Sequence, residues 1–515
     1  MITQHAPVLI PVLYMLAALV IPLAGYLRTG LSHAVAVLTA GLVFAISVAG
    51  LLEVMQSGTI SYHLGGWMPP LGIELVMDPL SALISVVISG SALFVMVYAR
   101  DSVSDEMPGK TMPFYSLSML LLCGLAGMTL TGDFFNLYVF LEITALAGYG
   151  LLAIGNKRAP FSAFRYLTLG TAGAAFYLLG VAFIFIATGS LNMIDIGQIL
   201  PLIHDSRPVT VGLVLIVLGV CIKMGIFPLH HWLPDAYTHA SSAATALIAP
   251  VGTKVAVYVL IRTLIIYDFP PIIDLLSWVA ALSIVVGSIL AITQSNIKRM
   301  LAYSSVANIG YITLGITLAN PLAFIGALLH IINHALMKMV LFMVAGGIFK
   351  QMGTLSIARL RGFPTLMPFT ALAFIIAVLS MVGIPPTGGF FSKLYLILGA
   401  VEAGAWFFVF AILLSTLLAI VYLFRVINIA FFRPYEKIDD ARITQANDPE
   451  LVTPFRAADE SDKVFETKPR REMGLLMLLP ALLGALVIVL VGVYSGLIVE
   501  SFIEPAIPEI IKSSR

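Results

Sequence analysis

The sequence predicts an all-α polytopic membrane protein with about 14 transmembrane helices, two of them broken, and two inverted five-helix repeats. Three observations predict this fold: the composition, the number of long apolar runs, and a short motif that occurs twice. Of the 515 residues, 60% are apolar and 11% are charged, whereas a soluble domain is about 45–50% apolar and about 25% charged. Because so little charge cannot cover a folded surface in water, lipid must surround most of the chain.

Fourteen apolar runs are long enough to cross a hydrocarbon layer about 30 Å thick, for which an α-helix needs about 20 residues. In chain order they are residues 7–27, 31–52, 75–99, 112–131, 133–154, 162–189, 208–228, 240–266, 272–293, 300–319, 321–349, 367–399, 404–431 and 473–500. Residues 1–6 contain no Lys or Arg, and the run that follows has no obvious cleavage site. We therefore expect no removable signal peptide.

The distribution of basic residues predicts the orientation. Twenty of the 28 Lys and Arg residues lie in loops after odd-numbered spans, and four lie in loops after even-numbered spans or in the tail. Because cytoplasmic loops collect Lys and Arg, we expect a protein of the cell membrane with both termini outside and the polar loop 433–472 inside. The net charge of +1 gives no electrostatic reason to expect nucleic acid as a partner.

Two spans contain prolines where a helix should continue. The motifs are Gly225-Ile226-Phe227-Pro228 in the seventh span and Gly383-Ile384-Pro385-Pro386 in the twelfth. Proline removes a backbone donor and clashes with the preceding turn, so we expect helix breaks at Pro228 and at Pro385 and Pro386. The motifs lie five spans apart, and an odd number of spans inverts the second copy across the membrane. Inverted repeats with discontinuous helices are typical of transporters, although a kink without function is the alternative for each break.

The repeat predicts five parts of the chain. They are residues 1–111 with transmembrane helices 1–3, 112–271 with the first five-helix repeat, 272–432 with the second repeat, 433–472 as a cytoplasmic loop, and 473–515 with the last transmembrane helix and the tail.

Four lysines lie inside predicted spans, and they are the strongest functional signal. They are Lys223, Lys254, Lys338 and Lys393. An ionised side chain at mid-membrane costs roughly 2.5–3.5 kcal/mol on insertion scales, so these groups need partners or must lose their charge. Snorkelling to the interface is the alternative for any single lysine.

Three other titratable groups accompany these lysines. Glu142 is the acid near the middle of a span, and a carboxylate near a buried lysine can load or unload its proton. His330 and His334 precede Lys338 at spacings of four, which places all three on one helix face. The histidines could instead be core residues that bond neighbouring helices. We interpret the whole set as a proton relay.

A cluster of titratable residues follows the first break. It contains His230, His231, Asp235 and His239. We favour a mouth through which protons enter over a metal site. The two cysteines, Cys123 and Cys221, lie in apolar runs and act as small hydrophobic residues. Without a phosphate loop, a dinucleotide-binding glycine turn or a cysteine cluster, we expect no cofactor and no metal.

From about residue 75 to residue 432, the chain resembles the antiporter-like subunits shared by respiratory complex I, membrane-bound hydrogenases and Mrp multisubunit cation/proton antiporters. The stretches that carry the resemblance are Phe135-Asn136-Leu137 to Glu142, Phe227 to Ala236, Lys298 to Ser305, His330 to Lys338, and Gly383 to Lys393. The segment Thr253 to Arg262 and the lysine at position 393 look most like the Mrp D subunits.

The resemblance implies a role for each buried charge. Glu142 and Lys223 would be the glutamate and lysine partners of the fifth and seventh spans, and Lys254 would be the connecting lysine. His330, His334 and Lys338 would form the central relay, and Lys393 would be the exit residue.

The resemblance also implies the function and the partners. We expect the proton-translocating subunit of a multisubunit cation/proton antiporter, with sodium as the cation. The partners would be other hydrophobic subunits, including a larger antiporter-like sister subunit, together with protons, a monovalent cation and membrane lipid. The main alternative is a proton-pumping subunit of a complex I-like or hydrogenase-type oxidoreductase, so whether the chain belongs to an enzyme stays open. A self-sufficient single-chain transporter and a structural scaffold are further alternatives.

Overall fold

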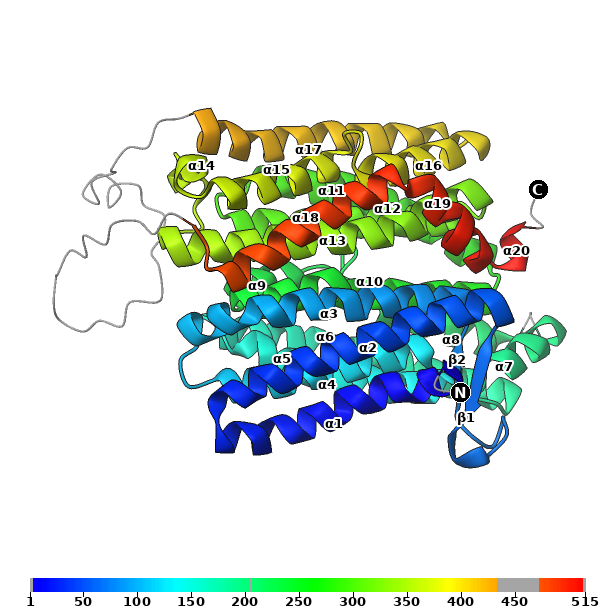
Figure 1. Ribbon diagram of the computed structural model, residues 1–515. Coiled ribbons are helices and arrows are strands. Elements are labelled where there is room, and N and C mark those ends of the chain that lie inside the picture. Colours follow the sequence, from blue (N-terminus) through cyan, green and yellow to red (C-terminus); the bar gives the residue numbers. More distant parts are fainter. Residues whose placement is uncertain (1–2, 204–205, 433–471, 513–515) are drawn as a thin grey trace.

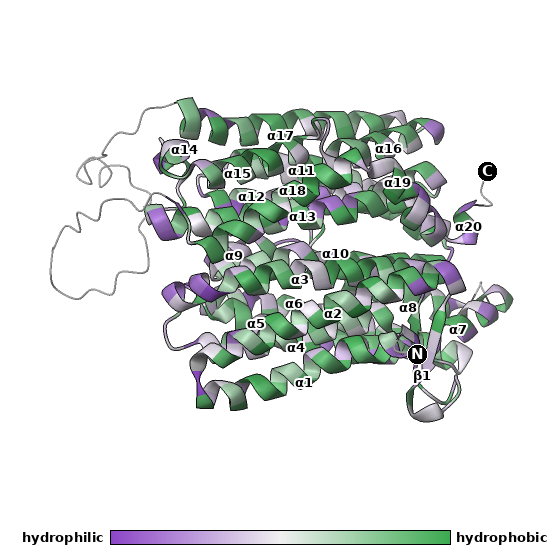
Figure 2. Cartoon of the chain, viewed as in Figure 1, coloured by the Kyte–Doolittle hydropathy of each residue, from purple (hydrophilic) through white to green (hydrophobic). Residues whose placement is uncertain are grey.

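A computed structural model describes residues 3–203, 206–432 and 472–512. Long helices lie side by side and nearly parallel to one axis (Figure 1). Apolar residues fill the middle of the bundle, while hydrophilic residues gather at its two ends (Figure 2). Within the described ranges, twelve helices are long and apolar enough to cross a membrane.

The N-terminal part contains three long helices and one hairpin. They are α1 (Ala6–Leu27), α2 (Thr29–Ser57), β1 (Ile60–His63), β2 (Glu74–Met77) and α3 (Pro79–Glu106). The two strands pair antiparallel, with Ile60 opposite Met77. The hairpin was not expected from the sequence: β1 lies between two expected spans, and β2 overlaps the first residues of the expected span 75–99, whose helix α3 begins only at Pro79.

The middle part contains seven helices and ends at the central helix α10. They are α4 (Thr111–Leu130), α5 (Phe134–Ala153), α6 (Ala159–Thr188), α7 (Met193–Ile199), α8 (Arg207–Met224), α9 (Trp232–His239) and α10 (Ser242–Ile266).

The remaining helices complete the bundle. They are α11 (Pro270–Ile292), α12 (Ile297–Thr317), α13 (Pro321–Met352), α14 (Phe363–Leu366), α15 (Pro368–Val382), α16 (Gly388–Glu402), α17 (Trp406–Phe432), α18 (Leu475–Val493), α19 (Ser495–Ile498) and α20 (Glu509–Lys512).

The structure confirms both expected breaks. The helix α8 ends at Met224 before Gly225, and α15 ends at Val382 before Gly383. Both glycines have positive φ angles, +69° and +91°, which favour glycine and close a helix. Twelve of the expected spans correspond to the twelve candidate helices, and the other two correspond to α12 and to the broken pair α15 and α16. The count of fourteen and the five-part division stay predictions, and loop 433–472 lies outside the described residues except for Glu472.

Polar side chains cap the N-termini of five helices, α3, α5, α10, α12 and α13. The N-cap side chain accepts hydrogen bonds from backbone N–H groups of the first turn, which otherwise lack partners. These caps are Asp78 for α3, Asp133 for α5, Ser241 for α10, Asn296 for α12 and Asn320 for α13.

The helices α10 and α13 form the centre of the bundle, because nearly all of their side chains are buried. Small residues let other helices approach closely around them. A Cβ atom on Gly212 of α8 would lie 2.9 Å from the carbonyl oxygen of Gly180 on α6, and one on Gly310 of α12 would lie 2.7 Å from the carbonyl oxygen of Ala280 on α11. The central position of α10 and α13 places their lysines and histidines away from lipid.

One end of the bundle carries most of the described basic residues, and we call it the basic end. There α3 and α13 end and α10 and α12 begin (Figure 1). Basic residues at this end are Arg28, Lys110, Arg158, Arg299 and Lys350. The start of α1, the hairpin, α7 and α20 lie at the opposite end (Figure 1).

Candidate functional site

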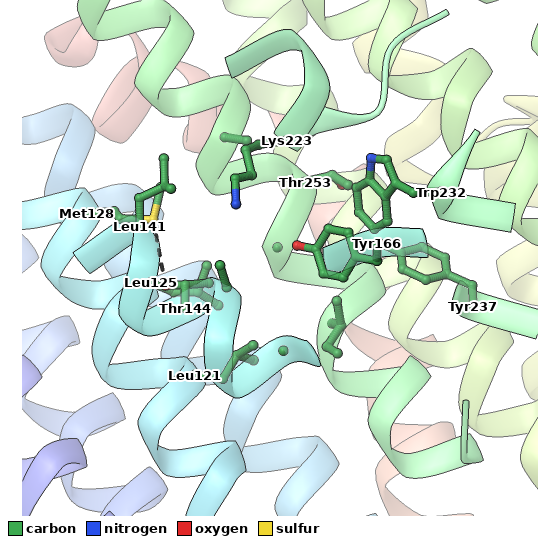
Figure 3. Close-up of a pocket in the computed structure, with 15 residues that line it drawn as sticks. Leu121, Leu125, Met128, Leu141, Thr144, Tyr166, Lys223, Trp232, Tyr237 and Thr253 are labelled. Carbon is green, nitrogen blue, oxygen red and sulfur yellow. Dashed lines mark hydrogen bonds between the residues drawn. The ribbon is translucent and has the colours of Figure 1, made fainter. Parts of the chain in front are cut away.

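The first break positions Lys223 at the edge of a cavity. Lys223 lies in the last turn of α8, and its Nζ points into a small hollow with a volume of about 40 Å³ for water-sized molecules (Figure 3). Around it lie the polar side chains of Thr144, Tyr166, Tyr237 and Thr253. The Trp232 indole N–H donates to the carbonyl oxygen of Ile222 at 2.8 Å. Tryptophan thus supplies a hydrogen bond to a carbonyl group in the last turn of α8, and Lys223 Nζ makes no such bond.

Glu142 and Lys223 are neighbours without a direct ion pair. Both residues are described, and no contact within 4.0 Å joins their charged atoms. Glu142 Oε1 and Lys223 Nζ are buried and have no hydrogen-bond partner in the protein. The carboxylate still attracts the ammonium electrostatically, and Lys223 Nζ lies 5.9 Å from the centre of the Tyr149 ring. This geometry leaves both groups free to gain or lose a proton without breaking a hydrogen bond.

Lys254 lies at the centre of the molecule on α10. Its Nζ donates to the carbonyl oxygen of Ala249 at 2.6 Å and to Thr253 Oγ1 at 3.3 Å. Its charge acts electrostatically on His330, His334 and Lys338, the row of titratable groups on α13.

His330 has a protein partner on each ring nitrogen. Nε2 lies 2.9 Å from Asn308 Oδ1 and Nδ1 lies 2.9 Å from Ser392 Oγ. The Asn308 amide N–H₂ donates to the carbonyl oxygen of Ser304 at 2.6 Å, which leaves Oδ1 as an acceptor. Nε2 of His330 therefore carries a proton, and Nδ1 lies against the Ser392 hydroxyl, which is also 3.1 Å from the carbonyl oxygen of Gly389.

His334 and Lys338 continue the row along α13. The ring of His334 stacks on that of His330 with centres 6.0 Å apart, and neither of its nitrogens has a hydrogen-bond partner in the protein. Lys338 Nζ donates to the carbonyl oxygen of Leu301 at 2.6 Å and to the hydroxyl of Ser304. All three side chains of the row are fully buried, which excludes snorkelling for Lys338.

Lys393 closes the second break. Its Nζ donates to the carbonyl oxygens of Met381 at 2.9 Å and Val382 at 3.1 Å, which are the last residues of α15. It also lies 5.3 Å from the centre of the Tyr311 ring. The preceding residue, Ser392, bonds His330. Two adjacent residues of α16 therefore contact the row on α13 and the end of α15.

The expected mouth for protons divides into two pairs. The rings of His230 and His231 stack with centres 4.8 Å apart, and His230 is buried while His231 is exposed. Asp235 forms ion pairs with Arg165 at 2.6 Å and with Arg299 at 3.5 Å.

The second pair consists of Asp235 and His239, which also contact each other. The Nδ1 of His239 lies 2.9 Å from Ser162 Oγ and 3.0 Å from the carbonyl oxygen of Asp235. Asp235 is thus held by two guanidinium groups, and the role of this cluster in proton uptake stays a prediction. Among residues 3–203, 206–432 and 472–512, no three His, Cys, Asp or Glu side chains are arranged to hold a metal ion.

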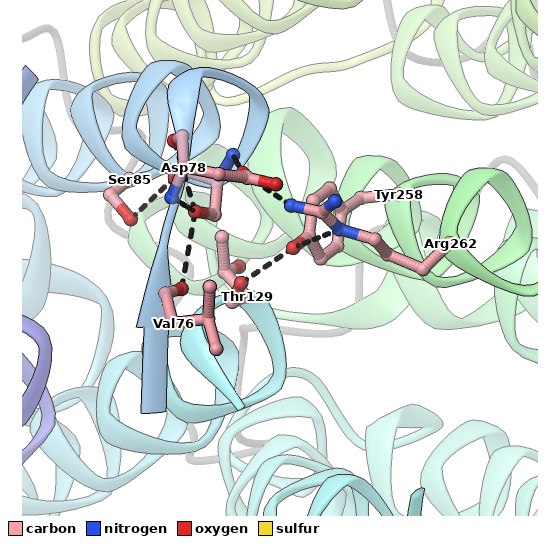
Figure 4. A network of polar contacts seen from close by, with 7 residues as sticks. Val76, Asp78, Ser85, Thr129, Tyr258 and Arg262 are labelled. Carbon is pink, nitrogen blue, oxygen red and sulfur yellow. Dashed lines mark hydrogen bonds and ion pairs between the residues drawn. The ribbon is translucent and has the colours of Figure 1, made fainter. Parts of the chain in front are cut away.

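Sequence reasoning missed a polar network at the end opposite the basic end. Arg262 of α10 bonds the carboxylate of Asp78, and its Nε donates to the Tyr258 hydroxyl at 2.7 Å (Figure 4). That hydroxyl donates to the carbonyl oxygen of Thr129 at 2.7 Å. Burial alone would raise the pKa of Asp78, but Arg262 and hydrogen bonds from Ser81 hold it below its usual value of 3.8. The spacing of four between Lys254, Tyr258 and Arg262 was a usable signal, since it places them on one helix face.

Lys298 is one of the twenty basic residues that the sequence analysis placed in loops after odd-numbered spans, and for Lys298 this placement was wrong. Lys298 lies in the first turn of α12 and is only 2% exposed. The pair Lys298-Arg299 at the border of an apolar run resembles an ordinary positive flank, so nothing in the local pattern indicated burial.

A model of the family described as "NADH:quinone oxidoreductase/Mrp antiporter, TM" matches residues 131–419. The chain is 42% identical to the N subunit of an NADH-quinone oxidoreductase from Desulforudis audaxviator, over 98% of this chain and 99% of that protein. It is 33% identical to the D subunit of a Na(+)/H(+) antiporter from Bacillus subtilis, over 76% of this chain and 81% of that protein.

Solved structures of two membrane complexes contain chains with this fold. One is the Mrp complex from Dietzia sp., with a TM-score of 0.85, 26% identity, and coverage of 98% of this chain and 97% of that chain. The other is the membrane-bound sulfane sulfur reductase, described as an archaeal respiratory membrane complex, with a TM-score of 0.86, 30% identity and the same coverage. Both the family and the helical architecture expected from the sequence are confirmed.

Proposed function

The chain belongs to the NADH:quinone oxidoreductase/Mrp antiporter family of membrane subunits, and we propose that it moves protons across the membrane along its buried lysines and histidines. It is an antiporter-like subunit of the kind found in Mrp antiporters and complex I-like complexes. One observation carries the proposal: the row of His330, His334 and Lys338 is fully buried on the central helix α13. Buried ionisable groups in a membrane protein mark ion or proton pathways.

The relay has two halves joined by Lys254. In the first half, Glu142 controls the charge on Lys223, whose Nζ faces the cavity without a hydrogen bond. In the second half, protons pass from Lys254 to the row on α13 and leave near Lys393. Each transfer moves a proton from an ammonium or imidazolium group to a neutral amine or imidazole, and a positive charge nearby promotes release.

We propose an antiporter as the complex in which this relay works. The whole chain would then exchange a cation, with sodium as the candidate, for protons in the cell membrane, with both termini outside. The similarity to the D subunit of a Na(+)/H(+) antiporter and to a chain of the Mrp complex supports this choice. The partners would be further hydrophobic subunits, including a larger antiporter-like chain, and lipid.

A second candidate is the pumping subunit of a redox-driven complex. The observation that favours it is the 42% identity to the N subunit of an NADH-quinone oxidoreductase over nearly the full length of both chains. In that complex the same relay would be driven by electron transfer in partner proteins.

One purification separates the two candidates and also tests the relay. The tagged chain is extracted gently from its membranes, and the co-purifying proteins are identified by mass spectrometry. Small hydrophobic subunits and a larger antiporter-like chain support the antiporter, whereas iron–sulfur, flavin or nickel–iron proteins support the redox complex. Proton movement by the reconstituted complex is then measured with a pH-sensitive dye, and its absence under both a cation gradient and a redox drive contradicts the relay.

A further inference from the structure

We propose that Lys298 and Glu106 form a separate proton inlet at the basic end of the bundle, which feeds Lys338 directly. This inference rests on the proposed proton-translocating function. It adds an inlet to the second half, where the sequence predicted a single mouth after the first break. The proposal depends on the burial of Lys298, its neighbours, and the face of α12 that it shares with the relay.

Lys298 lies inside the protein rather than at its surface. Its side chain is 2% exposed, and its Nζ donates to the carbonyl oxygen of Ala240 at 3.1 Å. Both Lys298 and Glu106 are described, and no ion pair within 4.0 Å joins Lys298 to a described acid. Burying an ammonium group is costly, and an apolar residue would avoid that cost. A lysine at this position therefore points to use of its proton.

The helix α12 links Lys298 to the groups that bond the relay. Leu301 and Ser304, which accept the hydrogen bonds of Lys338, follow Lys298 by one and two helical turns. Asn308, which bonds His330, lies further along the same face. One face of α12 therefore contacts the row of titratable groups on α13. On the same helix, Lys298 lies closer than this row to the basic end of the bundle.

An acidic residue near Lys298, Glu106, is accessible from the surface. Glu106 is the last residue of α3 and is partly exposed. Its carboxylate accepts the backbone N–H of Ser242 at 2.9 Å, at the start of α10. Glu106 also attracts Lys298 electrostatically. A carboxylate that is partly exposed to water and interacts electrostatically with a buried lysine is well placed to take up protons.

The steps balance in protons and charge. The Glu106 carboxylate takes a proton from water at the basic end and passes it to the neutral amine of Lys298, which regenerates the carboxylate and forms an ammonium. Lys298 then passes the proton to the neutral amine of Lys338, and its own amine is ready for the next proton. The hydroxyl of Ser304, which bonds Lys338, belongs to α12, the helix that also carries Lys298.

A structural role is the competing explanation, because Lys298 also bonds the connection between α9 and α10. The variant Lys298→Arg separates the two explanations. Arginine keeps the positive charge and the donors but does not release its proton in proteins. A structural role predicts that arginine preserves function, whereas a proton-carrying role predicts that Lys298→Arg is as defective as Lys298→Met.

A matched control lies beside the inlet. Lys350 of α13 pairs with Asp105 of α3 at 2.6 Å, at the same end of the bundle, and the Asp105 side chain is 49% exposed. Lys350→Arg changes the same residue type one helix away, and Asp105→Asn matches Glu106→Gln. Neither control residue belongs to the proposed route.

The experiment measures initial rates of proton movement by the full complex in membrane vesicles, with complex assembly checked by co-purification. We expect Lys298→Arg and Glu106→Gln to lower the rate at least tenfold in assembled complexes, and Lys350→Arg and Asp105→Asn to leave it within twofold of the unmodified protein. A near-normal rate for Lys298→Arg would overturn the inlet.

Lys338→Met distinguishes this failure from failure of the proposed function. If Lys338→Met stops proton movement while Lys298→Arg does not, the relay stands and the inlet is rejected. If the unmodified complex moves no protons, or if Lys338→Met moves them normally, both proposals are rejected.

Discussion

Lys393 Nζ lies 3.1 Å from the carbonyl oxygen of Val382, the last residue of α15, although the two residues belong to different halves of a broken helix. The last carbonyls of a helix lack intrahelical donors and carry a partial negative charge. An ammonium group from α16 satisfies them at the second break. At the first break, the Trp232 indole serves this purpose, and Lys223 is left facing a cavity.

This asymmetry predicts different consequences for the two lysines. Lys393→Met leaves two carbonyls without a donor, and an unsatisfied buried acceptor costs about 1–3 kcal/mol. We expect lower proton movement and a lower midpoint of thermal unfolding of the purified complex. Lys393→Arg should keep the unfolding midpoint, and Lys512→Met, which changes a lysine in an exposed pair with Glu509, is the control. An unchanged midpoint for Lys393→Met would contradict the capping role.

Lys223 should affect function without a comparable effect on stability. Its Nζ makes no hydrogen bond, so Lys223→Ala removes little that holds the fold together. We expect Lys223→Ala and Glu142→Gln to abolish proton movement while the complex still assembles, because the first removes the carrier and the second removes the charge that controls it. The test combines co-purification with the vesicle dye assay. Normal proton movement in either assembled variant excludes this half of the relay.

Asn308 should set the tautomer of His330. Its Oδ1 accepts the Nε2 proton, so Asn308→Leu removes the group that keeps the proton on Nε2. We expect the rate of proton movement to fall about 10-fold to 100-fold, by analogy with groups that orient histidines at metal sites. Ser288→Ala is the control, because it removes a buried hydroxyl bond of 2.7 Å to Ser415 outside the relay. Equal rates for the two variants would show that the tautomer is irrelevant.

The pair of Asp78 and Arg262 should stabilise the protein in a pH-dependent manner. The pKa of Asp78 is lower in the folded protein than its usual value of 3.8, so its stabilising contribution is present above that value and is lost as the pH falls through the folded pKa. Near pH 7 we expect Asp78→Asn to lower the free energy of unfolding by about 1–3 kcal/mol.

Thermal unfolding of the purified protein at several pH values measures this effect. The difference between Asp78→Asn and the unmodified protein should shrink below about pH 4. Glu509→Gln, in an exposed pair, should show no measurable difference at any pH. A difference for Asp78→Asn that does not depend on pH would contradict the electrostatic explanation.

The sequence alone determined the features that depend on neighbouring residues. Apolar runs of about 20 residues identified the spans because crossing lipid requires them, and glycine followed by proline identified both breaks because these residues end a helix wherever they occur. The unusual lysines were visible for the same reason, since a charge inside an apolar run is conspicuous without any knowledge of its partners.

Only the tertiary structure decided which partner each charge meets. Lys338 bonds Leu301 and Ser304, Lys393 bonds the end of α15, and Glu142 makes no direct ion pair with Lys223. The burial of Lys298 and the contact of Arg262 with Asp78 were equally invisible, since 184 residues separate the latter two. The physical reason is that hydropathy and backbone preferences act along the chain, whereas hydrogen bonds and ion pairs depend on distances of a few ångströms that arise only when the helices pack.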